Sequence, residues 1–180
     1  MEIVIQNVVA SSSIGVPLDL QKISMSLEDA EYVPEKFPGL IYKLKEPKTA
    51  MLLFTSGKLV CTGAKSVDMV HKAVGIVLDN ISKLGIDVPK KPEIKVQNIV
   101  ATSDLNKDLN LNTIAISLGL EKVEYEPEQF PGLVYRVDHP RVVMLLFGSG
   151  KIVCTGAKEI KDIDLALKEI VKELTDAGLI

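Results

Sequence analysis

An internal duplication constrains this chain more than any other feature of its sequence. All eight Phe and Tyr residues fall into four pairs whose members lie 93 positions apart, and the chain has no Trp. Residues 51–65 (MLLFTSGKLVCTGAK) and 144–158 (MLLFGSGKIVCTGAK) are identical at 13 of 15 positions. A period of about 90 residues is longer than the roughly 20–50 residues of solenoid and propeller repeats, so it predicts a duplicated half-domain. The aromatic pairs are Tyr32 and Tyr125, Phe37 and Phe130, Tyr42 and Tyr135, and Phe54 and Phe147.

The spacing of the repeat changes along the chain. QNVVAS (6–11) matches QNIVAT (97–102) at an offset of 91, which implies two extra residues between Ser12 and Tyr125 in the second copy. The only linker-like stretch, residues 87–93, is short and flanked by prolines. We therefore expect one repeat over 1–88 and another over 89–180, held in fixed relation rather than loosely tethered.

Composition excludes several classes of protein. With 47% hydrophobic and 25% charged residues the chain is globular rather than disordered. No apolar run approaches 18 residues, and the start lacks a basic n-region, so neither a membrane span nor a secretion signal is expected. Cys61 and Cys154 have no metal-ligand or redox spacing around them, which predicts buried thiols in an intracellular protein. No cofactor is expected, and His71 and His139 are unpaired in the repeat, so neither is assigned a catalytic or metal-binding role.

The periodicity of each copy predicts a strand, a short helix, three strands and a long helix. The strands are expected at 3–11, 37–44, 49–55 and 58–64, then at 94–103, 130–137, 142–148 and 151–157; the short helices are expected at 18–27 and 109–118. Ser66 can cap the first long helix, and Gly85 and Gly178 stand where a left-handed residue ends a helix. This order predicts an α+β fold, with one antiparallel sheet and helices packed on one face.

The strands are unusual because both of their alternating faces are apolar. Leu52, Phe54 and Val60 alternate with Met51 and Leu53, although too few helices are available to cover two faces. Such a sheet either self-associates or binds a large ligand through its second face. Basic side chains and two amides near that face favour a nucleic-acid groove over a dimer interface. These residues are Lys43, Lys58, Arg136, Lys151, Asn7 and Asn98.

The chemistry of this face suits the minor groove of A·T-rich DNA. That groove offers only acceptors at A·T pairs, whereas a G·C pair adds the guanine amino group. Phe side chains can wedge between base steps and kink the duplex. The net charge of −3 and the pI near 5.5 argue against a phosphate binder unless charge is segregated. The acidic residues of the closing helix, over 159–176, predict such segregation.

The paired motifs QN[VI]VA, FPGL[IV]Y, LLFxSGK and TGAK resemble the TATA-box-binding protein family, in its short archaeal form, over residues 3–180. The resemblance implies two pseudo-symmetric repeats that form one curved, antiparallel, ten-stranded sheet, a saddle with four helices on its convex face. It implies a general transcription initiation factor that is not an enzyme and that acts in the cytoplasm at the nucleoid. The implied partners are double-stranded TATA-box DNA, transcription factor B and, indirectly, RNA polymerase.

The family's functional positions can be carried over one by one. The resemblance implies that Phe37, Phe54, Phe130 and Phe147 intercalate into the DNA. Base contacts are implied for Asn7, Asn98, Thr62, Thr155, Val9, Val100, Leu52, Leu145, Val60 and Val153. Contacts to the DNA backbone are implied for Lys43, Arg136, Ser56, Ser149, Lys58 and Lys151. Glu126 and Glu128 are implied to contact transcription factor B; the alternative is that they are two solvated loop carboxylates.

Two classes of function therefore follow from the sequence. The first is a DNA-bending initiation factor. The alternative is a structural or scaffolding protein that dimerises through its apolar sheet face, and a homodimer in the absence of DNA is compatible with both. Pro38-Gly39 after the first wedge makes the halves alike, which leaves the orientation preference of the protein on DNA open.

Overall fold

The structure, a computed structural model, describes residues 1–180 and contains four helices and ten strands. The elements of the first half are β1 (Val4–Ser13), α1 (Leu20–Ser26), β2 (Ala30–Glu31), β3 (Leu40–Lys45), β4 (Lys48–Leu53), β5 (Lys58–Ala64) and α2 (Val67–Ser82). Those of the second half are β6 (Lys95–Asp104), α3 (Leu111–Leu118), β7 (Val123–Glu124), β8 (Leu133–Val137), β9 (Val142–Leu146), β10 (Lys151–Ala157) and α4 (Ile160–Asp176). The α+β prediction is confirmed.

The strand order of the sheet is β2-β3-β4-β5-β1-β6-β10-β9-β8-β7, so the ten strands implied by the resemblance are present. The chain forms two compact units: a first unit of residues Asn7–Gln97, and a second unit of Met1–Gln6 with Asn98–Ile180. Each unit thus contains the first residues of the strand that opens the other half. Side-chain hydrogen bonds hold these residues in their units: Gln97 Nε2 donates to Ser11 Oγ, and Gln6 Nε2 donates to Thr102 Oγ1.

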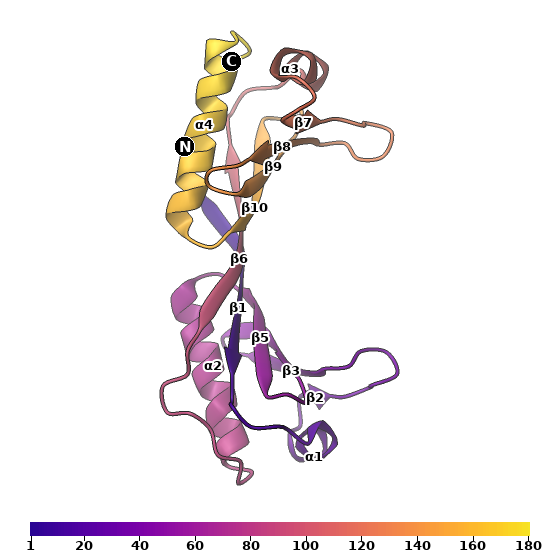
Figure 1. Ribbon diagram of the computed structural model, residues 1–180, viewed down its shortest axis with the longest axis vertical. Helices are drawn as coiled ribbons and strands as arrows, with labels where there is room; N and C mark the ends of the chain where they lie inside the picture. The colour runs from indigo at the N-terminus through magenta and orange to yellow at the C-terminus, as the bar shows by residue number, and fades with distance from the viewer. The chain divides into compact units, whose positions relative to one another are not determined.

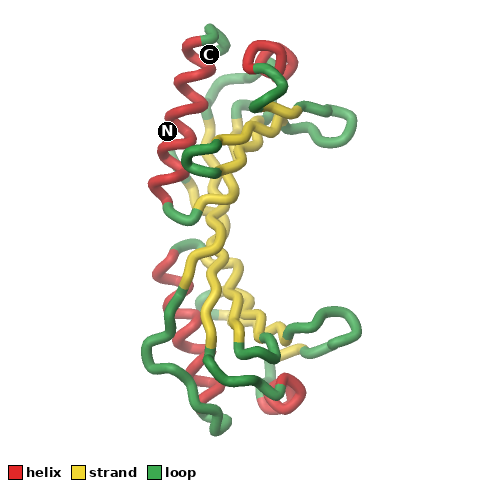
Figure 2. Tube along the Cα trace, viewed as in Figure 1, coloured by secondary structure: helices red, strands yellow, loops and turns green.

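In each unit the long helix covers one face of the strands (Figure 1). Helix α2 packs on β5 and β4, and α4 packs on β10 and β9. The alternation of the strands places one set of side chains, such as Met51, Leu53 and Cys61, under the helix, where they are fully buried. The loops that join β2 to β3 and β7 to β8 extend away from the long helices (Figure 2). One face of each unit is therefore covered, and the opposite face is left open.

The strand predictions at 37–44, 49–55, 130–137 and 142–148 were too long, and two strands were missed. Strands β3 and β8 begin at Leu40 and Leu133, three residues later than predicted, because the prolines at 38 and 131 cannot donate to a ladder. Phe37 and Phe130 consequently lie in loops, and Phe54 and Phe147 directly follow β4 and β9. Strands β2 and β7 have two residues each, too few for an alternation of side chains to be visible in the sequence.

The predicted helix ends are confirmed in the main. The Ser66 side chain caps α2 by accepting from the Met69 N–H at 3.1 Å, whereas Glu159 begins α4 without such a bond. Gly85 and Gly178 have positive φ values of 86° and 71°, as the left-handed ends require. None of the helices combines the length and apolar character that crossing a lipid bilayer requires.

The two extra residues of the second copy are Gly119 and Leu120. They are located by two equivalent backbone bonds, in which Lys43 N–H donates to Asp29 O and Arg136 N–H donates to Lys122 O. Gly119 ends α3 with a φ of 84°, and the Leu120 side chain is 89% exposed.

Candidate nucleic-acid interface

The open face of each unit has an apolar floor whose side chains are half-buried rather than buried. In the first unit Leu52 and Val60 face each other across β4 and β5, and in the second unit Leu145 and Val153 face each other across β9 and β10. Val9 and Val100 continue this floor on β1 and β6 with the same intermediate burial. The prediction of two apolar faces is therefore confirmed, and only one of them is covered by a helix.

An asparagine on the first strand of each half is held by two hydrogen bonds. Asn7 Oδ1 accepts from the Gly63 N–H at 2.7 Å, and its Nδ2 donates to Thr62 Oγ1 at 3.2 Å. Asn98 makes the same bonds, to the Gly156 N–H at 2.7 Å and to Thr155 Oγ1 at 3.2 Å. Gly63 and Gly156 have φ values of 91° and 97°, so a side chain at either position would be strained.

These bonds determine which polar hydrogens remain free. Because a backbone N–H can only donate, the oxygen of each amide must face the glycine, and this fixes the orientation of the amide. One Nδ2 hydrogen of each Asn then remains, together with the hydroxyl hydrogen of each Thr, which uses its oxygen as an acceptor. Each unit thus presents free hydrogen-bond donors within an apolar floor. These donors can pair with a surface that offers only acceptors.

A pair of Phe rings stands at the end of each open face. Phe37 and Phe54 meet edge to face, with ring centroids 6.0 Å apart and an interplanar angle of 63°. Phe130 and Phe147 repeat the arrangement at 5.9 Å and 67°. The four rings are partly exposed, and Phe130 is 39% exposed. Since buried aromatic rings are the rule in cores, four paired rings that reach the surface indicate a binding role.

Sequence reasoning missed the two glycines that position these rings. A Cβ added to Gly39 would lie 2.7 Å from the Phe37 ring and 3.0 Å from the Phe54 ring. A Cβ added to Gly132 would meet Phe130 and Phe147 at the same two distances. The rings therefore pack directly against the glycine backbone, where no side chain fits. The repeated Phe-Pro-Gly motif was the sequence feature that could have predicted this packing.

The predicted rim residues lie where the strands end or where they face solvent. Lys43 and Arg136 are exposed on β3 and β8, and Arg136 is 3.5 Å from Glu124. Lys58 and Lys151 begin β5 and β10 and are exposed too. Ser56 and Ser149 lie in the turns two residues before these lysines. Each serine hydroxyl accepts a hydrogen bond from the backbone N–H of the lysine at 3.4 Å.

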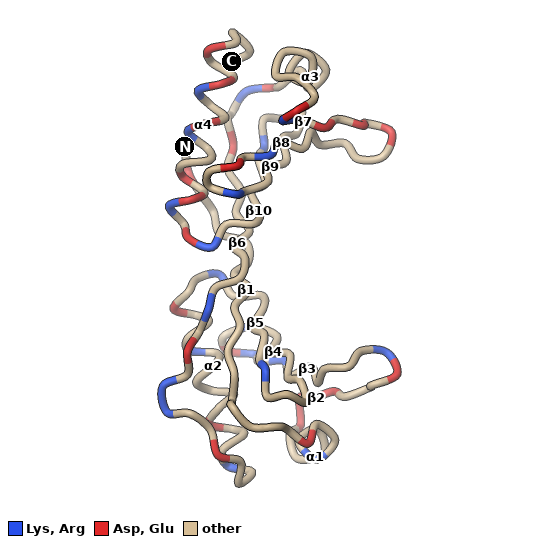
Figure 3. Tube along the Cα trace, viewed as in Figure 1, with Lys and Arg blue, Asp and Glu red and all other residues tan.

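Glu126 and Glu128 do not belong to the open face. They lie on the loop between β7 and β8, which carries acidic residues alone, whereas the equivalent loop of the first half carries Glu35 beside Lys36 (Figure 3). The charges of this loop differ between the two halves, although its backbone bonds are repeated: the N–H groups of Phe37 and Phe130 donate to Val33 O and Glu126 O.

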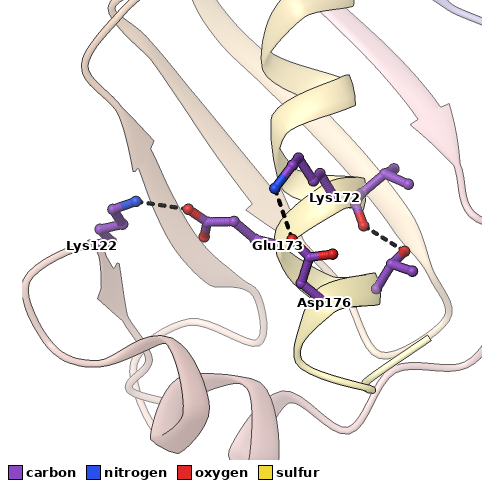
Figure 4. Close-up of polar contacts among 6 residues, drawn as sticks. Lys122, Lys172, Glu173 and Asp176 are labelled. Atoms are coloured by element: carbon purple, nitrogen blue, oxygen red, sulfur yellow. Dashed lines mark hydrogen bonds and ion pairs between the residues drawn. The ribbon is translucent and has the colours of Figure 1, made fainter.

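The acidic helix α4 is tied to the segment that precedes β7. Lys122 Nζ lies 2.7 Å from Glu173 Oε1, and Lys172 pairs with Asp176 at 2.8 Å (Figure 4). Glu173 occupies the position of Asn80, which donates to the Tyr42 hydroxyl at 2.8 Å in the first unit. The equivalent Tyr135 hydroxyl is buried near Glu173, and its burial together with this carboxylate raises its pKa. The pair of tyrosines is therefore structural.

Three comparisons with known proteins agree. Residues 2–84 and 93–177 each match the family model described as "Transcription factor TFIID (or TATA-binding protein, TBP)". The TATA-box-binding protein of Picrophilus torridus is 60% identical over 179 residues, which cover 99% of this chain and 97% of the relative. TATA-box-binding protein E of Halobacterium salinarum is 60% identical over 176 residues, which cover 98% of this chain and 95% of the relative.

A solved structure shows the same fold. The structure described as Methanococcus jannaschii TBP superposes with a TM-score of 0.89 at 52% sequence identity, covering 98% of this chain and 99% of that one. The resemblance drawn from the doubled motifs is confirmed by these matches. The two ranges matched by the family model, 2–84 and 93–177, correspond to the two halves of the sequence repeat.

Proposed function

Since this chain belongs to the TATA-binding protein family of transcription factors, we propose that it is a general transcription initiation factor that binds TATA-box promoter DNA through the minor groove. In this proposal it kinks the duplex by inserting Phe side chains and then nucleates assembly with transcription factor B and RNA polymerase.

The observation that carries this proposal is the donor pair in each apolar floor. Adenine N3 and thymine O2 accept hydrogen bonds in the minor groove, where a G·C pair would bring in an amino group that donates. The free hydrogens of Asn98 Nδ2 and Thr155 Oγ1 can bond to the acceptors, and Val100 and Val153 beside them offer no partner to an amino group. Such a face favours A·T over G·C without telling A·T from T·A.

The paired rings produce the kink in this proposal. Wedging an apolar side chain between two base steps costs a few kcal/mol of stacking, and this cost is offset by the larger contact that the bent duplex makes. In each unit one ring of the pair lies on the loop and the other at the strand end, so their two backbone attachments are independent. We assign the wedges to Phe37, Phe54, Phe130 and Phe147.

A bending measurement tests the wedges. The variant Phe130→Ala is expected to lower the energy transfer between dyes at the two ends of a TATA duplex and to weaken binding by about tenfold or more. Gly132→Ala is expected to reduce bending as well, because the added Cβ would displace the Phe130 ring. Leu165→Ala is the matched control, since Leu165 is 51% exposed on α4 and should affect neither quantity. Unchanged transfer in Phe130→Ala would refute the wedge role.

We assign the contact with transcription factor B to the acidic loop. Glu126→Gln combined with Glu128→Gln is expected to leave binding to the duplex intact and to abolish the slower band that transcription factor B adds in a gel shift. The control is Glu31→Gln combined with Glu35→Gln, which removes the same charge from the first half. If both double variants form the ternary complex equally well, the assignment is wrong.

The open apolar faces also support a second proposal, in which the protein is a scaffold that forms a homodimer through these faces. Sedimentation separates the two functions. A TATA duplex should dissociate a dimer that uses the open faces, whereas a scaffold would keep its mass whether or not the duplex is present.

A further inference from the structure

Each unit has a shallow hollow beside the C-terminal residues of β1 or β6, next to the lysine that begins the last strand. The hollow of the first unit is lined by Ser11, Ser13, Lys58, Glu93 and Lys95 among others. The hollow of the second unit is lined by Thr102, Asp104, Lys151, Glu2 and Val4 among others. Residue by residue these are the same positions of the two repeats.

The two hollows are built on the same hydrogen bonds. Ser12 donates to Glu93 O at 2.7 Å, and Ser103 donates to Glu2 O at 2.7 Å. The Ser13 hydroxyl accepts from the Gly15 N–H at 3.1 Å, and the Asp104 carboxylate accepts from the Asn106 N–H at 2.8 Å. Ser13 and Asp104 therefore close the same turn, so either side chain is compatible with the backbone of either unit.

The charges of the two hollows have opposite signs. The hollow of the first unit holds two lysines and one glutamate, and that of the second unit holds one lysine and two carboxylates. Lys151 pairs in register with Asp104, whereas Lys58 pairs in register with Ser13. The loop that follows β6 adds Lys107 and Asp108, which cancel, where the first half has Val16 and Pro17.

Asp104 lies on the open face and not under the helix. Along β6 the even-numbered side chains Asn98, Val100 and Thr102 are partly exposed, while Ile99, Ala101 and Ser103 between them are buried. Asp104 continues the exposed set at the end of the strand. A carboxylate in this place repels a phosphate that approaches Lys151 and screens the attraction between them.

We propose that Asp104 makes the second half of the interface the weaker phosphate contact and so gives a nearly symmetric protein a built-in direction on DNA. This inference rests on the proposed function, because it concerns the DNA backbone next to the rim lysines. Ser13, which carries no charge, leaves Lys58 as the stronger phosphate contact of the first half. A promoter whose two half-sites differ in flexibility is then bound preferentially in one orientation.

Exchanging the two turn residues tests the proposal on a self-complementary A·T duplex, for which both orientations are equivalent. Asp104→Ser is expected to tighten binding about threefold at ~0.1 M salt and to steepen the slope of log K against log salt by up to about 0.9, as one more phosphate is neutralised. Ser13→Asp is expected to do the reverse. Asp164→Ser on α4, with the same change of charge, is the control and should leave the slope unchanged.

Neutral methylphosphonates measure the inequality of the halves directly. One phosphate position of the self-complementary duplex is neutralised on one half-site or on both. For equal halves, the fold-loss from both substitutions equals the square of the fold-loss from one. For unequal halves it exceeds that square, because the protein can place its weaker half over the single neutral phosphate.

For the wild-type protein, at positions near the rim lysines, the fold-loss of affinity from two substitutions is expected to exceed the square of the fold-loss from one. For Asp104→Ser the two values are expected to be equal. The inference is wrong if the wild-type fold-loss from two substitutions equals the square of that from one at every position. It is also wrong if Asp104→Ser changes neither this relation nor the slope of log K against log salt. A wild-type protein that fails to bind the duplex at all would overturn the proposed function instead, so the two failures are distinguishable.

Discussion

At the scale of single residues, the proposed specificity depends on where a few hydrogens point. The carboxamides of Asn7 and Asn98 are useful because the Gly63 and Gly156 N–H groups occupy their oxygens, which leaves the nitrogen side for a ligand. Thr62 and Thr155 accept one of the two amide hydrogens and keep their own. The sequence identified these four residues through the repeat and the family resemblance. The glycines that orient them could not be found from the sequence, because only the register of β1 against β5 brings residues 7 and 63 together.

Replacing one amide tests this assignment. In Asn98→Asp the carboxylate can still accept from the Gly156 N–H, but it cannot donate and it repels the acceptors of an A·T groove. We expect binding to a TATA duplex to weaken by about 2 kcal/mol or more, with little change in the thermal midpoint. Asn112→Asp, an exposed change of equal charge on α3, is the control. Fluorescence anisotropy measures the affinity, and equal affinities of the two variants would contradict the donor role.

At the scale of elements, β5 and β10 form the boundary between the interface and the core. Alternate residues of each strand face the ligand side, while Cys61 and Cys154 face the helices with exposures of 1% and 2%. Burial raises the pKa of Cys61 to about 11 and that of Cys154 to about 12. Both were predicted to be buried thiols from their mid-strand positions, and both are free and buried.

The buried thiols predict a loss of stability in alkali. Because an exposed thiol ionises near pH 8.5 and these ionise higher, the unfolded chain releases its protons first, so the stability they contribute is intact below pH 8.5 and is lost as pH rises toward 11 and 12. The expected loss is on the order of 1–2 kcal/mol per thiol by pH 10. Urea unfolding at pH 8 and pH 10 measures it. A Cys61→Ala, Cys154→Ala variant should lose less between these values, and an equal loss would contradict the account.

Element prediction succeeded where a pattern was long enough to repeat. The long helices have clear periods, and the hairpins have turn dipeptides just before Lys58 and Lys151. The structure has these elements within a few residues of their predicted positions. The prediction failed at Phe37 and Phe130, where an apolar run suggested a strand but a proline and a packed glycine impose a loop. Strands β2 and β7 are defined only by their partners β3 and β8, a tertiary contact that two residues cannot encode.

At the scale of the whole molecule, the duplication determines which features could be predicted from the sequence and which could not. Features present in both copies, such as the aromatic pairs and the paired asparagines, were recognisable because the sequence states them twice. Features that differ between the copies had no second example. The exchange of Asn80 for Glu173, the insertion of Gly119 and Leu120 and the exchange of Ser13 for Asp104 acquire their meaning only when the two units are compared in space.

The central claim is that the open faces read the minor groove of an A·T duplex. Inosine·cytosine pairs test it most directly, because inosine lacks the guanine amino group and so presents the acceptors of an A·T pair in the minor groove while keeping the major-groove edge of G·C. We predict that a TATA duplex rebuilt with inosine·cytosine pairs binds within a few-fold of the original, and that the guanine·cytosine version binds at least about a hundredfold more weakly. If the inosine duplex binds as weakly as the guanine duplex, the protein does not read the minor groove and the account is wrong.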